Sequence, residues 1–339
     1  MWAFAVGQFG WALLSGIISN WLVYFYQPDQ ETISQGQTVF VPQGLVVLGI
    51  VTVVGGITAF ARFFDAFVDP AVASLSDRCD AKSGRRMPFL KFAALPLAVV
   101  TVLVFWSPIN GTSWVNAAFL FVTVIGYYIA LTFYCTPYNA LIAELGHDSK
   151  RQLTISTAIS FTWVAGTAIA YVAPVIWGAF VPMMGRITAI RVTFTIMAAV
   201  AFVCMLVPPL AIREKDYVNS HPTSESTIES LKQTFGDGEF RKFVCSDVVY
   251  WVAITTFQTG LPFFVTSLLK LPETTTTIYF VLMTGVSVLF YLPVNILANK
   301  VGKKRLLLVA FVIFTCAFAF AGALGSAVLG FIPAMAQGL

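Results

Sequence analysis

Charged residues are scarce in this sequence: Asp, Glu, Lys and Arg together make up 11% of its 339 residues. Soluble globular domains contain about 25% charged residues and roughly 45–50% apolar ones, whereas 58% of this chain is hydrophobic and its mean hydropathy is +0.82. This shortage excludes an ordinary soluble domain. Apolar runs of about 20 residues recur along the chain, which is typical of transmembrane helices. The composition therefore predicts an all-α, multi-pass membrane protein.

Residues that catalytic and metal sites need are also few. There are two histidines, His147 and His221, and both fall in expected loops. The sequence contains no HExxH, GxSxG or ATP-binding motif, which disfavours a membrane enzyme and a primary transporter. The five cysteines show neither CxxC spacing nor a pairing pattern, so we expect no disulfide framework and no metal site. No cofactor is expected, and nothing in the charge pattern indicates nucleic acid as a partner.

The apolar runs predict the positions of the membrane spans. These lie at about residues 3–26, 45–68, 88–107, 114–137, 153–182, 188–211, 243–269, 274–298 and 305–325, and a further run begins near residue 328. We expect nine helices and the beginning of a tenth, in a chain that is cut short. The first run lacks the basic start and the cleavage site of a signal peptide, so it is expected to remain as the first helix.

The basic residues are distributed unevenly about these spans. Sixteen of the 20 lysines and arginines fall in loops on one side, three fall on the other side, and one, Arg62, lies within a span. Loops rich in Lys and Arg stay in the cytoplasm. We therefore expect a plasma (inner) membrane protein whose N-terminus is cytoplasmic.

A polar segment divides the chain. Residues 213–242 form the longest polar stretch, in which Ser226 and Glu229 fit a capping box at the start of a short amphipathic helix. This linker separates a predicted N-terminal bundle of six helices, residues 1–212, from a partial C-terminal bundle of three helices and the start of a fourth, residues 243–339. The loops SDRCDAKSGRRMP and ANKVGKKRL each follow the second helix of a half and share a glycine and a basic pair. Such parallel repeats are how major facilitator transporters are built.

Three charges interrupt the second span, in ITAFARFFDAFVDPAV (residues 57–72). Arg62, Asp65 and Asp69 are spaced by three and four residues, so they share one helical face. Each charge near mid-membrane costs on the order of 2.5–3.5 kcal/mol. An architectural Arg–Asp pair accounts for Arg62 and one aspartate but leaves the second aspartate unexplained. We interpret the aspartates as a cation or proton site with Arg62 as charge partner, and Pro70 as a helix end or a kink.

The same residues carry a family resemblance. ARFFDAFVDP followed by SDRCDAKSGRRMPFL resembles the second helix and following loop of the glycoside–pentoside–hexuronide:cation symporters, the melibiose-permease-like branch of the major facilitator superfamily, and TPYNALIAELGHDSKRQ also fits. The resemblance covers about residues 5–240 and is only architectural beyond them. It implies the major facilitator fold, with a six-helix N-terminal bundle and a partial second bundle. It also implies that Asp65 and Asp69 bind the coupling Na⁺, Li⁺ or H⁺.

The chain departs from this family pattern at four positions. Melibiose permease has asparagine, aspartate, aspartate and arginine where this chain has Val68, Cys135, Ala12 and Ile159. With few neutral oxygens nearby, a shared proton is easier to hold than sodium, although Thr132 supplies one oxygen. H⁺ is thus favoured as the coupling ion and Na⁺ stays open. The missing sugar ligands disfavour melibiose itself and leave a neutral sugar, an oligosaccharide, a hexuronide or a lysolipid.

Solute-binding residues are expected at mid-membrane between the two bundles. Amides and aromatic rings typically hold sugars, although a single aromatic residue can instead belong to the interfacial belt. The candidates are Asn20, Tyr24, Tyr128, Asn139, Trp163, Trp251 and Gln258. In the loop after the second span, the residues that match the superfamily's cytoplasmic gating motif are Asp77, Arg78, Gly84, Arg85 and Arg86.

These features predict a monomeric, cation-coupled symporter of a sugar or glycoside-like solute that works by alternating access in the lipid bilayer. A symporter of a lysolipid or another amphiphile, or a proton-driven exporter, is an alternative on the same fold. A channel and a non-transporting receptor are the other classes that the composition allows.

Overall fold

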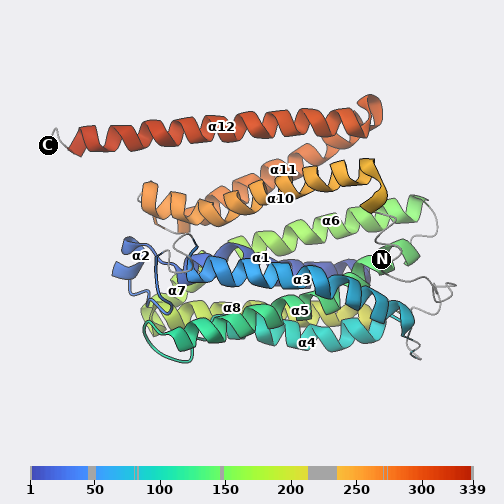
Figure 1. Cartoon of the computed structure of the whole chain (residues 1–339), viewed down its shortest axis with the longest axis horizontal. Coiled ribbons are helices and arrows are strands. Elements are labelled where there is room, and N and C mark those ends of the chain that lie inside the picture. The colour runs from blue at the N-terminus through green and yellow to red at the C-terminus, as the bar shows by residue number, and fades with distance from the viewer. Residues whose placement is uncertain are drawn as a thin grey trace. The chain divides into compact units, whose positions relative to one another are not determined.

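The computed structural model describes residues 2–44, 51–79, 81, 84–145, 149–212, 235–269, 271–272 and 274–336 (Figure 1). The described residues are largely helical, and the chain divides into two compact units, Met1–Thr277 and Ile278–Leu339. The predicted all-α, multi-pass fold class is confirmed. The linker boundaries at residues 212 and 242 stay a prediction, because residues 213–234 lie outside the described residues, with the predicted linker helix among them.

The first unit holds most of the helices. They are α1 (Trp2–Tyr26), the short α2 (Gln30–Ser34), α3 (Val53–Arg78), α4 (Met87–Val104), α5 (Trp114–Leu145), α6 (Ser149–Tyr171), α7 (Ala173–Met184), α8 (Arg186–Ala211), α10 (Gly238–Phe263) and the π-helical turn η2 (Phe264–Leu268). The helix α11 (Thr274–Val301) begins in this unit, and α12 (Lys303–Ala336) belongs to the second.

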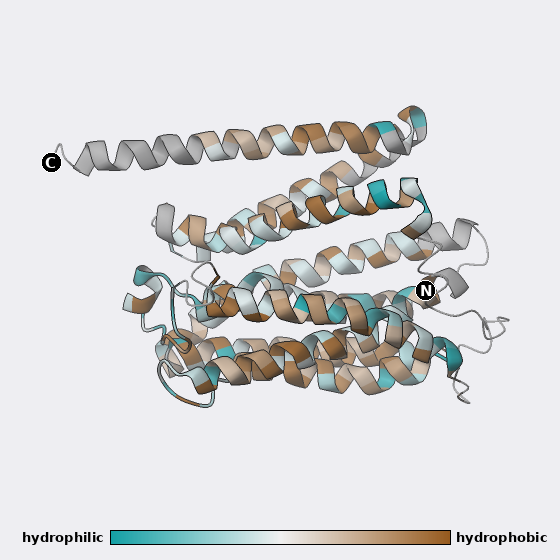
Figure 2. Cartoon of the chain, in the orientation of Figure 1, coloured by the Kyte–Doolittle hydropathy of each residue, from teal (hydrophilic) through white to brown (hydrophobic). Residues whose placement is uncertain are grey.

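Six helical stretches of the described residues are long and apolar enough to cross a membrane: Trp2–Tyr26, Met87–Val104, Trp114–Ile142, Ile155–Met184, Arg186–Ala211 and Gly238–Thr266. Figure 2 shows that α4 and α5 are hydrophobic over most of their length. The helix α3 is not among the six, because it contains Arg62, Asp65 and Asp69. The helix that the sequence singles out by its charges is therefore too highly charged to be recognised by hydropathy alone.

Several predicted boundaries differ from the structure. The helix α3 continues through Pro70 to Arg78, ten residues beyond the predicted end at residue 68. Pro70 therefore does not end the helix. The predicted span 153–182 is divided at Val172 into α6 and α7, where Pro174 occupies the first turn of α7, a position that suits proline. The predicted start of a separate helix near residue 328 is wrong, because α12 runs unbroken to Ala336. The sequence of α12 has no proline near residue 328 that could interrupt the helix; its first proline is Pro333.

The helix α1 is the centre of the first unit and packs most extensively against α6 and α8. Small residues permit this close approach. A Cβ atom added at Gly166 of α6 would lie 2.6 Å from the carbonyl oxygen of Phe9, and one added at Gly10 would lie 2.6 Å from the carbonyl oxygen of Ala201. Glycine at such contacts lets two membrane helices pack backbone to backbone.

Buried aromatic side chains tie α1 to its neighbours by hydrogen bonds. The Trp21 indole donates to the carbonyl oxygen of Ala170 at 2.8 Å, and the Tyr138 hydroxyl donates to the carbonyl oxygen of Phe4 at 2.6 Å. In a membrane each buried donor needs an internal partner, because lipid offers none. These bonds give α1 a fixed position against α5 and α6.

Replacement of Gly166 by alanine tests this packing. The new Cβ atom meets backbone atoms that cannot move aside, so we expect the free energy of unfolding to fall by about 1–3 kcal/mol. A thermal-unfolding measurement in detergent checks it. Gly126→Ala on α5 is the matched control, because its Cβ atom would meet only Val100 Cγ1, at an ordinary 3.5 Å. Equal stability of the two variants would contradict the prediction.

Candidate functional site

A cavity of about 970 Å³ lies within the first unit, among α1, α3, α5, α6 and α10. Its walls combine carboxylates, one guanidinium, amides, hydroxyls and tryptophans. The lining residues are Trp11, Ala12, Ser15, Gly16, Ser19, Asn20, Arg62, Asp65, Asp69, Pro70, Ala73, Leu131, Thr132, Cys135, Thr136, Asn139, Trp163, Thr167, Tyr171, Tyr250, Trp251, Ile254, Thr255 and Gln258.

The acidic wall is built by two helices in register. Asp65 Oδ1 accepts a hydrogen bond from Thr132 Oγ1 at 2.6 Å, and Asp69 Oδ1 accepts one from Thr136 Oγ1 at 3.1 Å. The two aspartates are four residues apart on α3, and the two threonines are four residues apart on α5. The same hydroxyl–carboxylate contact therefore recurs one helical turn further along both helices. Cys135 lies beside the two threonines and also lines the cavity. Each carboxylate thus has one neutral oxygen partner from α5.

Arg62 is held against the wall of the cavity by an aromatic ring. Its guanidinium carbon lies 4.6 Å from the centroid of the Tyr128 ring, within the range of a cation–π interaction. Of the ion pairs within the described residues, none joins Arg62 to Asp65 or Asp69. Arg62 is therefore positioned by α5 rather than by a direct bond to the aspartates.

The opposite wall is aromatic and amide-bearing. Trp11 of α1 and Trp163 of α6 meet edge to face, with ring centroids 4.8 Å apart. Asn20 is 1% exposed, and its Nδ2 donates to the carbonyl oxygen of Gly16 at 2.7 Å. Its Oδ1 is buried and has no hydrogen-bond partner. This wall thus has an unpaired acceptor, Asn20 Oδ1, and an unpaired donor, Trp11 Nε1.

The helix α10 closes the cavity with Trp251 and Gln258. Gln258 Nε2 donates to the hydroxyl of Tyr171 at 3.3 Å, which links α10 to α6. Near the other end of α1, Thr266 Oγ1 of η2 donates to Asp29 Oδ2 at 2.9 Å. Residues beyond the predicted linker thus complete a cavity that begins in the first six helices.

The structure brings most of the predicted site residues together. Arg62, Asp65, Asp69, Thr132, Asn20, Asn139, Trp163, Trp251 and Gln258 all line the cavity. Tyr24 and Tyr128 are not among the lining residues. Tyr24 is buried at the end of α1, where its hydroxyl lies 3.3 Å from Thr32 Oγ1, and Tyr128 lies beneath Arg62.

Sequence reasoning missed Trp11, Cys135 and Thr136 as lining residues. Thr136 had a readable signal, because it follows Thr132 by four residues as Asp69 follows Asp65. Trp11 had none, since one tryptophan in the first span is indistinguishable from an interfacial aromatic residue. Only its packing against Trp163 places it in the cavity.

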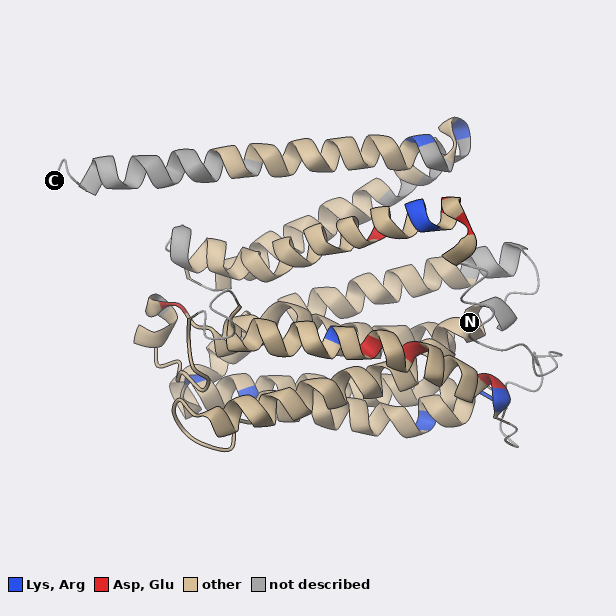
Figure 3. Ribbon diagram, in the orientation of Figure 1, with Lys and Arg blue, Asp and Glu red and all other residues tan. Residues whose placement is uncertain are grey.

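The predicted gating loop contains an ion pair. Arg86 Nη2 donates to Asp77 Oδ1 at 2.9 Å, between the end of α3 and the start of α4. Gly84 has a φ of +116°, a conformation that L side chains rarely adopt, which explains glycine in the motif. Arg78 is exposed. Figure 3 shows acidic and basic residues along α3, whereas α1 carries none.

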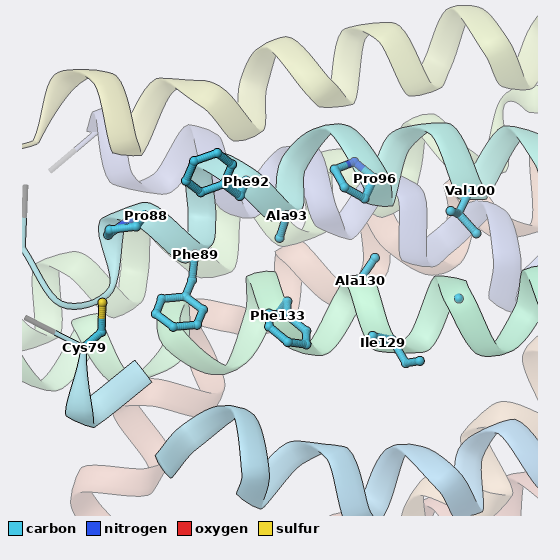
Figure 4. A pocket seen from close by; sticks show the side chains of 11 residues that line it. Cys79, Pro88, Phe89, Phe92, Ala93, Pro96, Val100, Ile129, Ala130 and Phe133 are labelled. Carbon is cyan, nitrogen blue, oxygen red and sulfur yellow. The ribbon is translucent and has the colours of Figure 1, made fainter. Parts of the chain in front are cut away.

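A second cavity, of about 510 Å³, is a groove between α4 and α5 (Figure 4). Phe89 of α4 points toward α5, where Phe133 also lines the groove, and Cys79 lies near Phe89. Its lining has no charged or amide side chain, and Phe92 is 76% exposed. The groove is suited to lipid contact rather than to binding a polar solute.

Comparison with known proteins agrees with the helical fold and the polar cavity. Residues 3–337 match the family described as MFS/sugar transport protein. The chain belongs to this family. MFS/sugar transport proteins are transporters rather than enzymes, in agreement with the missing catalytic motifs.

Curated relatives in this family are symporters and sugar transporters. The inner membrane symporter YicJ of Escherichia coli K12 is 25% identical over 226 residues, or 65% of this chain and 47% of that protein. The isoprimeverose transporter of Lactiplantibacillus pentosus is 24% identical over 168 residues, 49% of this chain and 31% of that protein. The putative glycoside/cation symporter YagG of E. coli K12 is 29% identical over 115 residues, 34% and 25% respectively. The matched region spans less than half the length of each of these relatives.

The contact between Arg62 and Tyr128 predicts an energetic coupling. In a double-mutant cycle of Arg62→Met and Tyr128→Leu, we expect a coupling of about 0.5–2 kcal/mol in the free energy of unfolding, because each single change removes the same cation–π contact. Arg62→Met combined with Tyr134→Leu is the control, since the Tyr134 hydroxyl instead donates to the carbonyl oxygen of Met205. A zero coupling for Tyr128 would show that the guanidinium lies elsewhere.

Proposed function

We propose that this MFS/sugar transport protein is a cation-coupled symporter of a sugar or glycoside-like solute that works by alternating access. One observation carries the proposal. Asp65 and Asp69 both line a cavity whose walls also carry amides and tryptophans, so one cavity offers an ion site and a solute site. Coupling requires that the two ligands affect each other's binding, and a shared cavity provides the means.

The ion site consists of the two carboxylates and the hydroxyls of Thr132 and Thr136. A hard cation prefers several oxygen ligands, and this set supplies carboxylate and hydroxyl oxygens from α3 and α5. The coupling ion is H⁺ or Na⁺. The name of YagG as a glycoside/cation symporter supports cation coupling in the family.

The solute site lies between Trp11 and Trp163 on one side and Trp251 and Gln258 of α10 on the other. Aromatic rings and amides are suited to the apolar faces and hydroxyl groups of a sugar. The name of the isoprimeverose transporter supports a carbohydrate solute.

Alternating access requires two bodies that move around the loaded site. The cavity joins helices of the proposed N-terminal bundle, residues 1–212, to α10 of the proposed partial bundle, residues 243–339. We assign the Asp77–Arg86 pair, with Arg78, Gly84 and Arg85, to the cytoplasmic gate. The basic loops support a cytoplasmic N-terminus, and the name of the inner membrane symporter YicJ supports an inner-membrane location. We assign the protein as a monomer.

Replacement of the aspartates tests the coupling. In proteoliposomes containing the full chain, solute uptake from a panel of glycosides is measured with a Na⁺ gradient, with a pH gradient and with neither. We expect one gradient to drive uptake, and Asp65→Asn and Asp69→Asn each to lower the driven rate at least about tenfold, because each removes a charge that holds the ion.

Asp247→Asn on α10 is the control, because this exposed aspartate does not line the cavity. Its driven uptake should stay within about twofold of the parent. Uptake that ignores both gradients and survives both cavity substitutions would make the aspartates purely architectural and would end the proposal.

The hydroxyl of Thr132 gives a finer test. Thr132→Val keeps the shape of the side chain and removes the 2.6 Å hydrogen bond to Asp65. Hydrogen bonds to charged groups contribute about 1.5–3 kcal/mol. If the coupling ion is Na⁺, we expect its concentration for half-maximal uptake to rise about tenfold or more, because a ligand oxygen is lost. If the coupling ion is H⁺, we expect that concentration to fall instead, because the ionised carboxylate loses the hydrogen bond that stabilises it. Thr123→Val, on the same helix and bonded to the carbonyl oxygen of Phe119, is the matched control. An unchanged ion dependence in Thr132→Val would remove Thr132 from the ion site.

A further inference from the structure

The charges of the cavity do not balance one another. Among the described residues that line it, Arg62 carries one positive charge and Asp65 and Asp69 carry two negative charges. With both aspartates ionised, the described lining therefore has a net charge of −1. One monovalent cation or proton at the aspartates brings the sum to zero. A second cation or an anionic solute would each leave an uncompensated charge.

Arg62 is poorly placed to receive an anionic solute. Its guanidinium stacks on Tyr128, and the two aspartates follow it on the same face of α3. A carboxylate that approached Arg62 would approach Asp65 as well, and the two like charges would repel each other. The positive charge is thus already used in balancing the acidic pair.

The amide of Asn20 points to the same selection by an independent route. Its Oδ1 is buried in the cavity wall without a partner, while its Nδ2 is occupied by the carbonyl oxygen of Gly16. The same wall also has an unpaired donor, the indole N–H of Trp11, so its two unpaired groups suit hydroxyl groups, which both donate and accept. A hydroxyl group donates to such an oxygen, whereas a carboxylate is an acceptor only.

We propose that this cavity selects an uncharged, hydroxyl-bearing solute over its acidic counterpart and binds one monovalent cation with it. The selection rests on the proposed function, because it takes the aspartates to hold the coupling ion. Of the solutes that the sequence leaves open, neutral glycosides fit this cavity and hexuronides do not. By the same count of charges, the described lining is neutral when it holds one monovalent cation and an uncharged solute, and negative when it holds neither.

A matched series of sugars tests the charge selection. The neutral methyl glycoside that gives the largest uptake in the panel is compared with its uronate, in which a carboxylate replaces the CH₂OH group, and with its 6-amino analogue. Competition against labelled glycoside is measured at saturating coupling ion. We expect the uronate to compete at least about tenfold more weakly than the neutral sugar. At low coupling ion, the amino analogue should compete better than the neutral sugar. A uronate that competes equally or better would overturn the proposal.

A charge added to the wall should reverse the preference. Gln258 lines the cavity on α10, and Gln258→Lys adds a positive charge there, while Gln258→Met keeps a similar length without charge. We expect the ratio of uronate affinity to neutral-sugar affinity to rise about tenfold in the Lys variant relative to the Met variant. Equal ratios in two variants that both bind the neutral sugar would contradict the electrostatic basis. The competition series of neutral, acidic and amino sugars on the parent protein tests the charge selection even if the Gln258→Lys variant does not fold.

Equilibrium binding separates this inference from symport itself. Quenching of tryptophan fluorescence reports binding without any gradient, because Trp11 and Trp163 line the cavity. Tight neutral-sugar binding without gradient-driven uptake would defeat the proposed symport and leave the charge selection standing. Gradient-driven uptake of neutral sugar and uronate with equal affinity would leave the proposed symport standing and defeat the charge selection.

Discussion

The presence of three charges on one membrane helix is the constraint on which the rest of this site depends. A carboxylate or guanidinium inside a bilayer is costly unless it is paired, hydrogen-bonded or hydrated. On α3 the cost is reduced by hydroxyls from α5 at Asp65 and Asp69, by the ring beneath Arg62, and by the cavity that all three charges line. The cavity is thus a consequence of the charges as well as a place for ligands.

Close helix packing holds this arrangement in place. The helix α1 meets α6 and α8 through glycines such as Gly10 and Gly166, where a single added Cβ atom would strike backbone. Buried indole and phenol groups donate hydrogen bonds to carbonyl oxygens of neighbouring helices, as Trp21 and Tyr138 do. Rigid helices on both sides let α3 and α5 keep their four-residue register, and α10 then completes the wall with Trp251 and Gln258.

Much of the fold and part of the site could be predicted from the sequence. Hydropathy locates most helices because each must satisfy its own backbone inside a bilayer, and the i, i+4 spacing of Asp65 and Asp69 places both on one face whatever the neighbours are. The course of α3 past Pro70 could not be predicted, since a proline inside a membrane helix is tolerated only where neighbouring helices compensate. Neither could the burial of Tyr24, whose spacing on α1 fits a cavity position equally well.

The sequence by itself determined that this chain crosses the membrane, that an acidic pair lies on one helical face, and that the loops resemble those of cation symporters. These properties follow from local composition and helical periodicity. Only the tertiary structure decided which side chains share the cavity with Asp65 and Asp69, because contacts between α1, α5, α6 and α10 join residues up to about 250 positions apart in a chain of 339. The pairing of Trp11 with Trp163 and of Arg62 with Tyr128 depends on how the helices rotate and pack, which no periodicity records.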